Sequence, residues 1–243
     1  MATPVLSLRG VTKRFGGLVA VNAMDFDVTE REVVGLLGPN GSGKSTTLNL
    51  VSGALPLTSG NVSLWGNRIS GFPAQAINRK GVSRTFQLVR LLPSMNVREN
   101  VMAGAVFGHR RRWGHDARDH AEQLLEKVGL GGKGDMSLGQ LTYIDTKRVE
   151  LARTLASDPK VLLLDEWLAG LNPTELQIGI TLIKSLRDEG RTIILVEHVM
   201  DAIRSLCDRC VVMAAGTKIA EGTPTQVLSD KEVIRAYLGD DDA

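Results

Sequence analysis

The 243-residue sequence has few aromatic residues, only two cysteines and no long apolar run. Phe, Trp and Tyr make up 4% of the residues, which disfavours the aromatic platforms on which single-stranded nucleic acids stack their bases. No stretch approaches the roughly 18 consecutive apolar residues of a membrane-spanning helix, and the N-terminus lacks the basic and apolar regions of a signal peptide. The formal net charge of +2 gives no electrostatic footprint for a nucleic acid. If the protein works at a membrane, these absences predict a peripheral subunit.

The two cysteines, Cys207 and Cys210, form a C-x-x-C pair that invites a zinc or redox interpretation. A zinc site would need two more ligands nearby, and no Cys or His follows the pair in the chain. Cys207 closes an expected helix over Met200–Leu206, and Cys210 opens an apolar strand-like segment, Cys210–Ala214. We therefore interpret both residues as structural thiols of a protein kept in a reducing cytoplasm.

What the sequence does contain is a phosphate-binding P-loop. Residues 38–46 read GPNGSGKST, which matches the G-x-x-x-x-G-K-[ST] pattern. The apolar run Val33–Leu37 before it is typical of a buried strand, and a helix is expected from Ser45 onward. The three glycines let successive backbone N–H groups turn toward an anion, while Lys44 can reach the β- and γ-phosphates and the Ser45 hydroxyl can ligate Mg²⁺. The predicted nucleotide-binding residues are Gly38, Pro39, Asn40, Gly41, Ser42, Gly43, Lys44, Ser45 and Thr46.

Expected strands and helices alternate through most of the chain. The N-terminal stretches Val5–Val11 and Val19–Val28 flank a turn at 15–17, which indicates an antiparallel hairpin. Later apolar runs at 161–164, 192–196 and 210–214 alternate with helical segments, which favours a mainly parallel sheet covered on both faces. We therefore predict an α/β fold in one domain. It comprises a P-loop ATPase core with a mainly parallel sheet (1–87 and 159–243), an N-terminal antiparallel β subdomain and a helical insertion subdomain (88–158).

Two helices have recognisable ends. The pair Asn172-Pro173 and the later Gly190 frame a helix from Pro173 to Glu189. In the insertion, Asp116 is expected to cap a helix that ends at Gly129. The apolar face of that helix is expected to comprise Ala117, Ala121, Leu124, Leu125 and Val128.

Two carboxylates follow the expected strand Val161–Leu164. Asp165 and Glu166 would lie at the C-terminal edge of the sheet, where open α/β sheets bind their ligands. An Asp at this place can hold Mg²⁺ through its water shell, and the neighbouring Glu can orient or deprotonate an attacking water. Together with the P-loop, this pair predicts nucleotide hydrolysis.

The P-loop, Leu164–Glu166, Gly170–Thr174 and Val196–His198 follow one another in an order that resembles the ATP-binding subunits of ABC transporters, over essentially the whole chain. The resemblance implies an ATPase that uses ATP and Mg²⁺. The catalytic residues that it implies are Lys44, Gln87, Glu166 and His198. Mg²⁺ ligation is implied for Ser45, Gln87 and Asp165, and stacking on adenine for Phe15. The alternative for Phe15 is a core side chain of the hairpin turn.

Finer motifs resemble the branched-chain amino acid importer ATPases: Arg14–Gly17, Arg84–Gln87, Glu150–Arg153, Ala169–Pro173 and Val233–Gly239. Members of this branch are also associated with urea, amides and aromatic acids. The resemblance implies a cytoplasmic subunit on the inner face of the cell membrane. Its partners would be two transmembrane permease subunits, a second ATPase subunit and, indirectly, a substrate-binding protein, with no nucleic acid. The alternatives are the ATPase of a lipid or lipopolysaccharide exporter and a soluble ABC-type ATPase outside transport.

The sequence departs from the family at its signature motif. Counting back from Glu150–Arg153, the motif LSYGQ of this branch falls on LTYID, so the signature residues are Thr142, Tyr143, Ile144 and Asp145. Ile144 replaces the glycine that approaches the γ-phosphate of a partner's ATP, and a β-branched side chain disfavours both the close approach and positive φ. We therefore predict a heterodimer with an ATPase whose signature is intact; the alternative is that Thr142 and the Ile144 N–H suffice. Trp167 also replaces the proline usual after the catalytic Glu, for no reason visible in the sequence.

Overall fold

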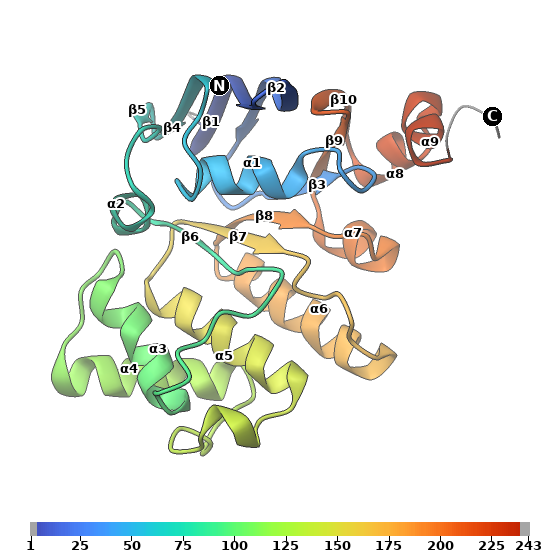
Figure 1. Cartoon of the computed structure of the whole chain (residues 1–243). Coiled ribbons are helices and arrows are strands. Elements are labelled where there is room, and N and C mark those ends of the chain that lie inside the picture. The colour runs from blue at the N-terminus through green and yellow to red at the C-terminus, as the bar shows by residue number, and fades with distance from the viewer. Residues whose placement is uncertain (1–3, 239–243) are drawn as a thin grey trace.

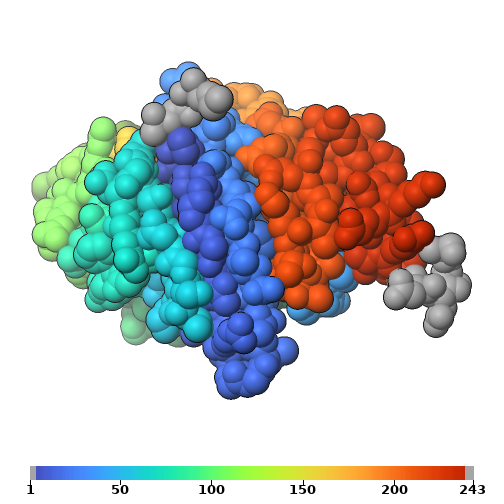
Figure 2. Space-filling view, turned by 90° about the horizontal axis from the view of Figure 1, so that it is seen from above, coloured from blue at the N-terminus to red at the C-terminus, as the bar shows by residue number. Residues whose placement is uncertain are grey.

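Two β-sheets organise the computed structural model, which describes residues 4–238 (Figure 1). The smaller sheet has the strand order β2-β1-β4-β5, and its pairings are all antiparallel. Its strands are β1 (Leu6–Phe15), β2 (Leu18–Val28), β4 (Ser59–Leu64) and β5 (Asn67–Arg68). The predicted N-terminal hairpin is confirmed. In Figure 2 the hairpin, in blue, lies between β4, in cyan, and the C-terminal elements, in orange and red. Gly239, the end of the Val233–Gly239 motif, and residues 1–3 lie outside the described residues.

The larger sheet has the order β10-β9-β3-β8-β7-β6. It is parallel from β9 to β6, and β10 pairs antiparallel with β9. Its strands are β3 (Val33–Leu37), β6 (Val82–Arg84), β7 (Val161–Asp165), β8 (Thr192–Val196), β9 (Arg209–Ala214) and β10 (Thr217–Gly222). Every residue of β3, β7 and β8 is buried, as expected for parallel strands covered on both faces. The predicted α/β class with a mainly parallel sheet is confirmed.

Helices cover both faces of the larger sheet (Figure 1). They are α1 (Lys44–Val51), α2 (Ala74–Arg79), α3 (Val97–Phe107), α4 (Gly114–Lys127), α5 (Tyr143–Ala156), α6 (Pro173–Asp188), α7 (Met200–Leu206), α8 (Pro224–Leu228) and α9 (Lys231–Leu238). Helix α1 lies between the two sheets, and α6 lies on the opposite face of the larger one. Within residues 4–238, none of these helices is both long and apolar enough to cross a bilayer.

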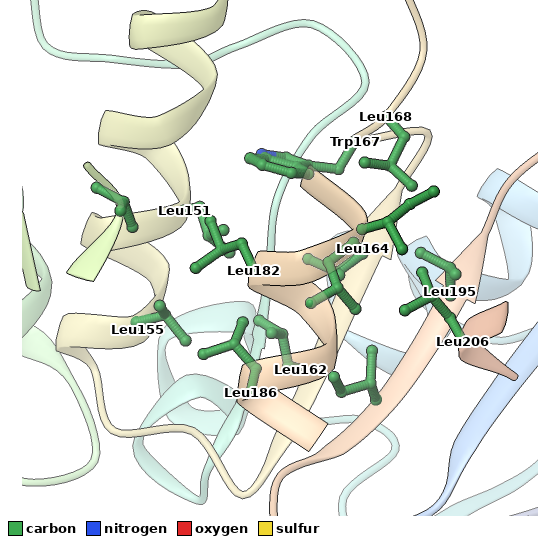
Figure 3. Packing of buried hydrophobic residues seen from close by; sticks show 14 of the residues in the cluster. Leu151, Leu155, Leu162, Leu164, Trp167, Leu168, Leu182, Leu186, Leu195 and Leu206 are labelled. Carbon is green, nitrogen blue, oxygen red and sulfur yellow. The ribbon is translucent and has the colours of Figure 1, made fainter. Parts of the chain in front are cut away.

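Successive side chains of each buried strand point to opposite faces of the larger sheet, and this divides the core into two clusters. On β7, Val161 and Leu163 pack with α1 and the smaller sheet, whereas Leu162 and Leu164 pack with α5 and α6. Figure 3 shows the second cluster, in which Leu162 and Leu164 face the leucines of α6. Strand β7 therefore contributes side chains to both clusters and anchors both layers of the core.

Helices α3, α4 and α5 pack against one another between β6 and β7 in the chain. They lie within the predicted insertion, whose boundaries as a subdomain stay predictions. The apolar face predicted for α4 is buried. Its start was predicted wrongly: α4 begins at Gly114 after Trp113, and Asp116 lies inside the first turn. Gly114 has φ +55°, so the chain can turn into the helix earlier, and Asp116 favours the helix through its charge near the N-terminus.

The predicted start of α6 is confirmed. Asn172 accepts a hydrogen bond from the Glu175 N–H, and the Glu175 side chain accepts one from the Asn172 N–H, which makes a capping box. Pro173 occupies the first helical position. The cysteines also lie where expected, at the end of α7 and within β9, and both are free and buried. A Cβ on Gly35 of β3 would lie 2.9 Å from Cys207 Sγ, so the thiols fill space beside the central strand.

Candidate nucleotide site

The P-loop connects β3 to α1 and depends on glycine at two places. Gly38 has φ +142°, and a Cβ there would lie 2.1 Å from the carbonyl oxygen of Met213. Gly43 has φ +104°, and a Cβ there would lie 2.5 Å from the carbonyl oxygen of Ala20. Both conformation and close packing therefore require glycine at the two ends of the loop.

Lys44 is folded over its own loop. Its ammonium donates to the carbonyl oxygens of Gly38 at 2.8 Å and Pro39 at 2.9 Å. Burial lowers the pKa of Lys44, and the charges of Glu166 and Asp165 oppose that shift. A buried cation held by weak neutral acceptors is well placed to exchange them for phosphate oxygens, which are stronger partners.

A cavity of about 260 Å³ opens beside Lys44. Its lining brings P-loop residues together with two predicted catalytic residues from distant segments: Ala20, Asn40, Gly41, Gly43, Lys44, Ser45, Thr46, Gln87 and Glu166. Asp165 adjoins Ser45 of this lining. The other predicted site residues outside the signature do not line the cavity: Phe15, Gly38, Pro39, Ser42 and His198.

Glu166, Gln87 and His198 converge from the ends of three neighbouring parallel strands. The carboxylate of Glu166 accepts a hydrogen bond from Gln87 Nε2 at 2.7 Å, and His198 Nδ1 lies 3.8 Å from its other oxygen. The backbone N–H of Glu166 donates to the Val196 carbonyl, and Glu166 has φ +50°. A non-glycine residue in this conformation is uncommon and is maintained by its surroundings, which is frequent at functional sites.

Asp165 is held by a cation that the sequence analysis quoted only as part of a motif. Arg84 Nη2 lies 3.0 Å from Asp165 Oδ2, with 8% and 3% of the two side chains exposed. Arg84 also donates to Asn49 Oδ1 at 2.6 Å, which joins β6 and β7 to helix α1. Burial raises the pKa of Asp165, whereas the charge of Arg84 lowers it.

The residues present fit a bound Mg²⁺. Ser45 Oγ lies 3.3 Å from Asp165 Oδ1, so a hydroxyl and a carboxylate oxygen already adjoin. Oxygen ligands of this kind are the ones Mg²⁺ prefers. Gln87, the third predicted ligand, lines the same cavity as Ser45.

Phe15 ends strand β1 with 46% of its surface exposed, so the alternative of a core side chain is wrong. The ammonium of Lys13 lies 5.0 Å from the centre of its ring. An exposed ring at this place is available for stacking, and contact with adenine stays a prediction.

The four signature residues lie away from the cavity, at the start of α5. Thr142 caps α5 by accepting from the Asp145 N–H at 3.3 Å, and Tyr143 is 57% exposed. Asp145 is buried and paired with Lys133 at 2.8 Å. Ile144 is half-buried. The substituted Asp145 is therefore engaged within its own subunit.

The structure gives Trp167 a function that the sequence did not reveal. The buried indole N–H donates to the Lys147 carbonyl at 3.2 Å, and the Lys147 ammonium donates to the carbonyls of Trp167 and Ala169 at 3.0 and 2.6 Å. Gly179 of α6 leaves room for the ring, because a Cβ there would lie 3.2 Å from Trp167 Cζ3. Figure 3 shows Trp167 among the helices of this cluster. Trp167 thus fastens the segment after Glu166 to α5.

Glu197, between Val196 and His198, is a buried acid that the sequence analysis did not single out. One oxygen accepts from the Leu168 N–H at 2.7 Å, and the other has no hydrogen-bond partner among residues 4–238. Burial raises its pKa to about 7. The Leu168 N–H and the charge of Lys147 oppose this shift, and the charge of Glu166 adds to it.

Replacing Glu197 by Gln is expected to change the pH dependence of stability. Because the folded pKa is raised from 4.5 to about 7, the protonated acid stabilises the fold fully below pH 4.5, and this contribution is lost as the pH rises through 7. Glu197→Gln should match the wild type near pH 5 and exceed its free energy of unfolding by about 3 kcal/mol at pH 8. Chemical unfolding at both pH values measures the difference, with the exposed Glu30→Gln as control. Parallel profiles for wild type and Glu197→Gln would refute the prediction.

The comparisons with known proteins agree with this geometry. The family described as "ABC transporter" matches residues 21–169, and the family described as "Branched-chain amino acid ATP-binding cassette transporter" matches residues 217–243. A nucleotide-free ATP-binding cassette of an ABC transporter superposes with a TM-score of 0.87 at 28% identity, covering 97% of this chain and 99% of that one. MJ1267, a cassette in its ADP conformation, gives 0.88 at 29% identity with the same coverage. The chain therefore belongs to the ATP-binding subunits of ABC transporters.

Three named relatives are similar to this chain over nearly its whole length. The chain is 40% identical to "High-affinity branched-chain amino acid transport ATP-binding protein BraF" of Pseudomonas aeruginosa, covering 99% of this chain and 100% of that protein. It is also 40% identical to the protein LivG of Escherichia coli, described in the same words, with the same coverage. "Lipopolysaccharide export system ATP-binding protein LptB" of Escherichia coli is 36% identical, with 99% of each chain covered. The predicted family is confirmed: this is a nucleotide-binding ATPase whose hydrolysis is coupled to transport.

Proposed function

We propose that this chain is the ATP-hydrolysing subunit of an importer of branched-chain or related amino acids. The observation that carries the proposal is the match of residues 217–243 to the branched-chain family, which lies outside the general ATPase motifs. The 40% identity to BraF and LivG over nearly their whole length supports it. LptB, at 36%, keeps an exporter of lipopolysaccharide as a second candidate.

Transport in a strain lacking this chain tests the substrate. Uptake of labelled leucine, isoleucine and valine should fall on deletion and return with the wild-type chain, but not with Glu166→Gln. Uptake of urea, amides and aromatic acids is measured beside it. The amount of lipopolysaccharide at the cell surface is measured in the same strains and tests the second candidate. A loss confined to lipopolysaccharide export would replace the importer by the exporter.

Within the site, we assign roles according to the contacts above. Mg²⁺, when bound by Ser45, Gln87 and Asp165, would neutralise phosphate charge together with Lys44. Glu166 would accept a proton from the attacking water while His198 helps hold the γ-phosphate. Phe15 would support the adenine ring. The P-loop residues would bind the remaining phosphate oxygens through their N–H groups.

The partners would be two transmembrane permeases, against which this chain would lie on the inner face of the cell membrane. Their docking place would be a second cavity, of about 430 Å³, between α2 on one side and helices α3 and α5 on the other. Phe107 and Leu92 line it and are 65% and 41% exposed, and Phe86, next to Gln87, lines it as well. Apolar side chains exposed around a concave surface favour a protein partner. A permease bound in this cavity would contact Phe86, next to Gln87. The hydrogen bond from Gln87 to Glu166 would connect this contact to the catalytic carboxylate.

The second ATPase would be a paralogue with an intact signature. Ile144 and the ion-paired Asp145 of this chain offer a partner's ATP fewer contacts than a glycine backbone would. Each lost charge-assisted hydrogen bond weakens closure roughly 10- to 100-fold.

Size-exclusion chromatography of Glu166→Gln with ATP and Mg²⁺ tests this prediction. We expect a monomer that dimerises when the second ATPase is added. A stable homodimer without it would contradict the prediction. The same run without nucleotide is the control, since ATP is expected to lie between the two subunits.

A further inference from the structure

The C-terminal helix α9 reaches back to the first residue of the P-loop. The hydroxyl oxygen of Tyr237 accepts a hydrogen bond from the backbone N–H of Gly38 at 2.8 Å, across 199 positions of the sequence. Figure 1 shows α9 beside the end of the larger sheet from which the loop leads into α1. Helix α9 also lies within the segment matched by the branched-chain family.

Gly38 needs this partner because of where it lies. It is buried, and it follows the last residue of β3 that pairs with β9, so the ladder ends before its N–H. A buried N–H without a partner is costly, and within residues 4–238 Tyr237 is the one acceptor recorded for it. A Cβ on Gly38 would lie 2.1 Å from the Met213 carbonyl oxygen, so the residue is packed closely against β9.

The carbonyl of the same residue accepts from Lys44. Gly38 is thus held on its N–H side by α9 and on its carbonyl side by the lysine that would bind phosphate. A change in the position of α9 would therefore act on the loop at the residue that also holds Lys44.

Helix α9 has few other attachments. Val233 is its one buried residue, at 2% exposed, whereas Ile234 and Leu238 are 40% and 60% exposed. An element with one apolar anchor opens at low free energy, so its docking responds readily to a small change elsewhere.

We propose that Tyr237 is a positioning residue of the nucleotide site: docking of α9 fixes the junction of β3 with the P-loop in the geometry that receives the phosphates. ATP binding and helix docking then stabilise each other, since coupling between two sites is reciprocal. The proposal goes beyond the transported substrate and holds for either candidate.

Equilibrium binding of ATP with Mg²⁺ to the full chain tests it, by calorimetry in the Glu166→Gln background to prevent turnover. Tyr237→Phe keeps the ring and removes only the acceptor. It should weaken ATP binding about 10-fold, or about 1.4 kcal/mol. Leu238→Ala, on the same helix with an exposed side chain, should stay within about twofold of the background. Val233→Ala, which loosens the anchor without touching the loop, should weaken binding in the same direction as Tyr237→Phe.

Hydrogen exchange distinguishes coupling from mere anchoring of the helix. ATP should slow exchange of the amides of 231–238 in the Glu166→Gln background and leave it unchanged once Tyr237→Phe is added. Unaltered affinity in Tyr237→Phe overturns the proposal, even if the variant unfolds at lower temperature. The proposal is also overturned if ATP slows exchange of the α9 amides equally in the Glu166→Gln background with and without Tyr237→Phe. A chain that did not bind ATP at all would instead contradict the assignment of the nucleotide site.

Discussion

Replacing Glu166 by Gln is expected to lower ATP turnover by ~10² or more while ATP remains bound. Attack of water on the γ-phosphoryl group requires positioning and charge neutralisation, with no covalent intermediate. Glu166 is positioned by the contact of its N–H with Val196 and by the hydrogen bond from Gln87 to its carboxylate. An amide keeps the size of the side chain but cannot accept the proton of water.

Turnover is measured in the assembled transporter, and ATP binding by calorimetry on the isolated chain. Glu30→Gln, an exposed carboxylate remote from the P-loop, is the matched control and should leave both unchanged. Hydrolysis at the wild-type rate in Glu166→Gln would show that another group accepts the proton. Loss of ATP binding along with turnover would show that Glu166 supports the nucleotide itself.

Replacing Arg84 by Met is expected to have the largest effect on stability. Within residues 4–238, the variant leaves the buried Asp165 carboxylate with the Ser45 hydroxyl as its one remaining hydrogen-bond partner. Removing one partner of a buried ion pair costs about 3–5 kcal/mol. Burial already raises the pKa of Asp165 and lowers that of Arg84, so both charges depend on each other. Arg84→Met also loses the hydrogen bond to Asn49.

Urea unfolding of Arg84→Met compares this pair with an exposed one. Arg9 and Asp27 lie 2.6 Å apart with 52% and 42% of their side chains exposed, so Arg9→Met should cost at most about 1 kcal/mol. Arg84→Met combined with Asp165→Asn should recover part of the loss, because the uncompensated charge is gone. If Arg84→Met costs no more than Arg9→Met, the buried pair does not stabilise the fold.

Local patterns were enough to predict the central strands. The run Thr192–Val196 was predicted as a strand and is β8 with the same bounds, because five consecutive apolar or β-branched residues suit a strand covered on both faces. The start of α6 at Pro173 followed from a proline and a capping residue, which act on their own backbone. Such signals are complete within a few residues, so tertiary structure has little to add.

The C-terminal elements were not predicted. Strand β10 is only partly buried and forms the edge of the sheet, so its conformation depends on pairing with β9. Helices α8 and α9 are short, five and eight residues, and isolated helices of that length are unstable in water. Packing against the sheet decides these elements, and their short sequences do not by themselves predict a strand or a helix.

The sequence by itself determined the P-loop, the pair of carboxylates at the end of β7 and the family, because these are short motifs whose chemistry depends on adjacent residues. Only the tertiary structure decided which distant groups meet. Gln87 reaches Glu166 across 79 positions, Arg84 reaches Asp165 across 81, and Tyr237 reaches Gly38 across 199. Parallel strands bring their carboxyl ends to one edge whatever their separation in the chain, so these contacts follow from strand order and helix docking, and no local pattern encodes them.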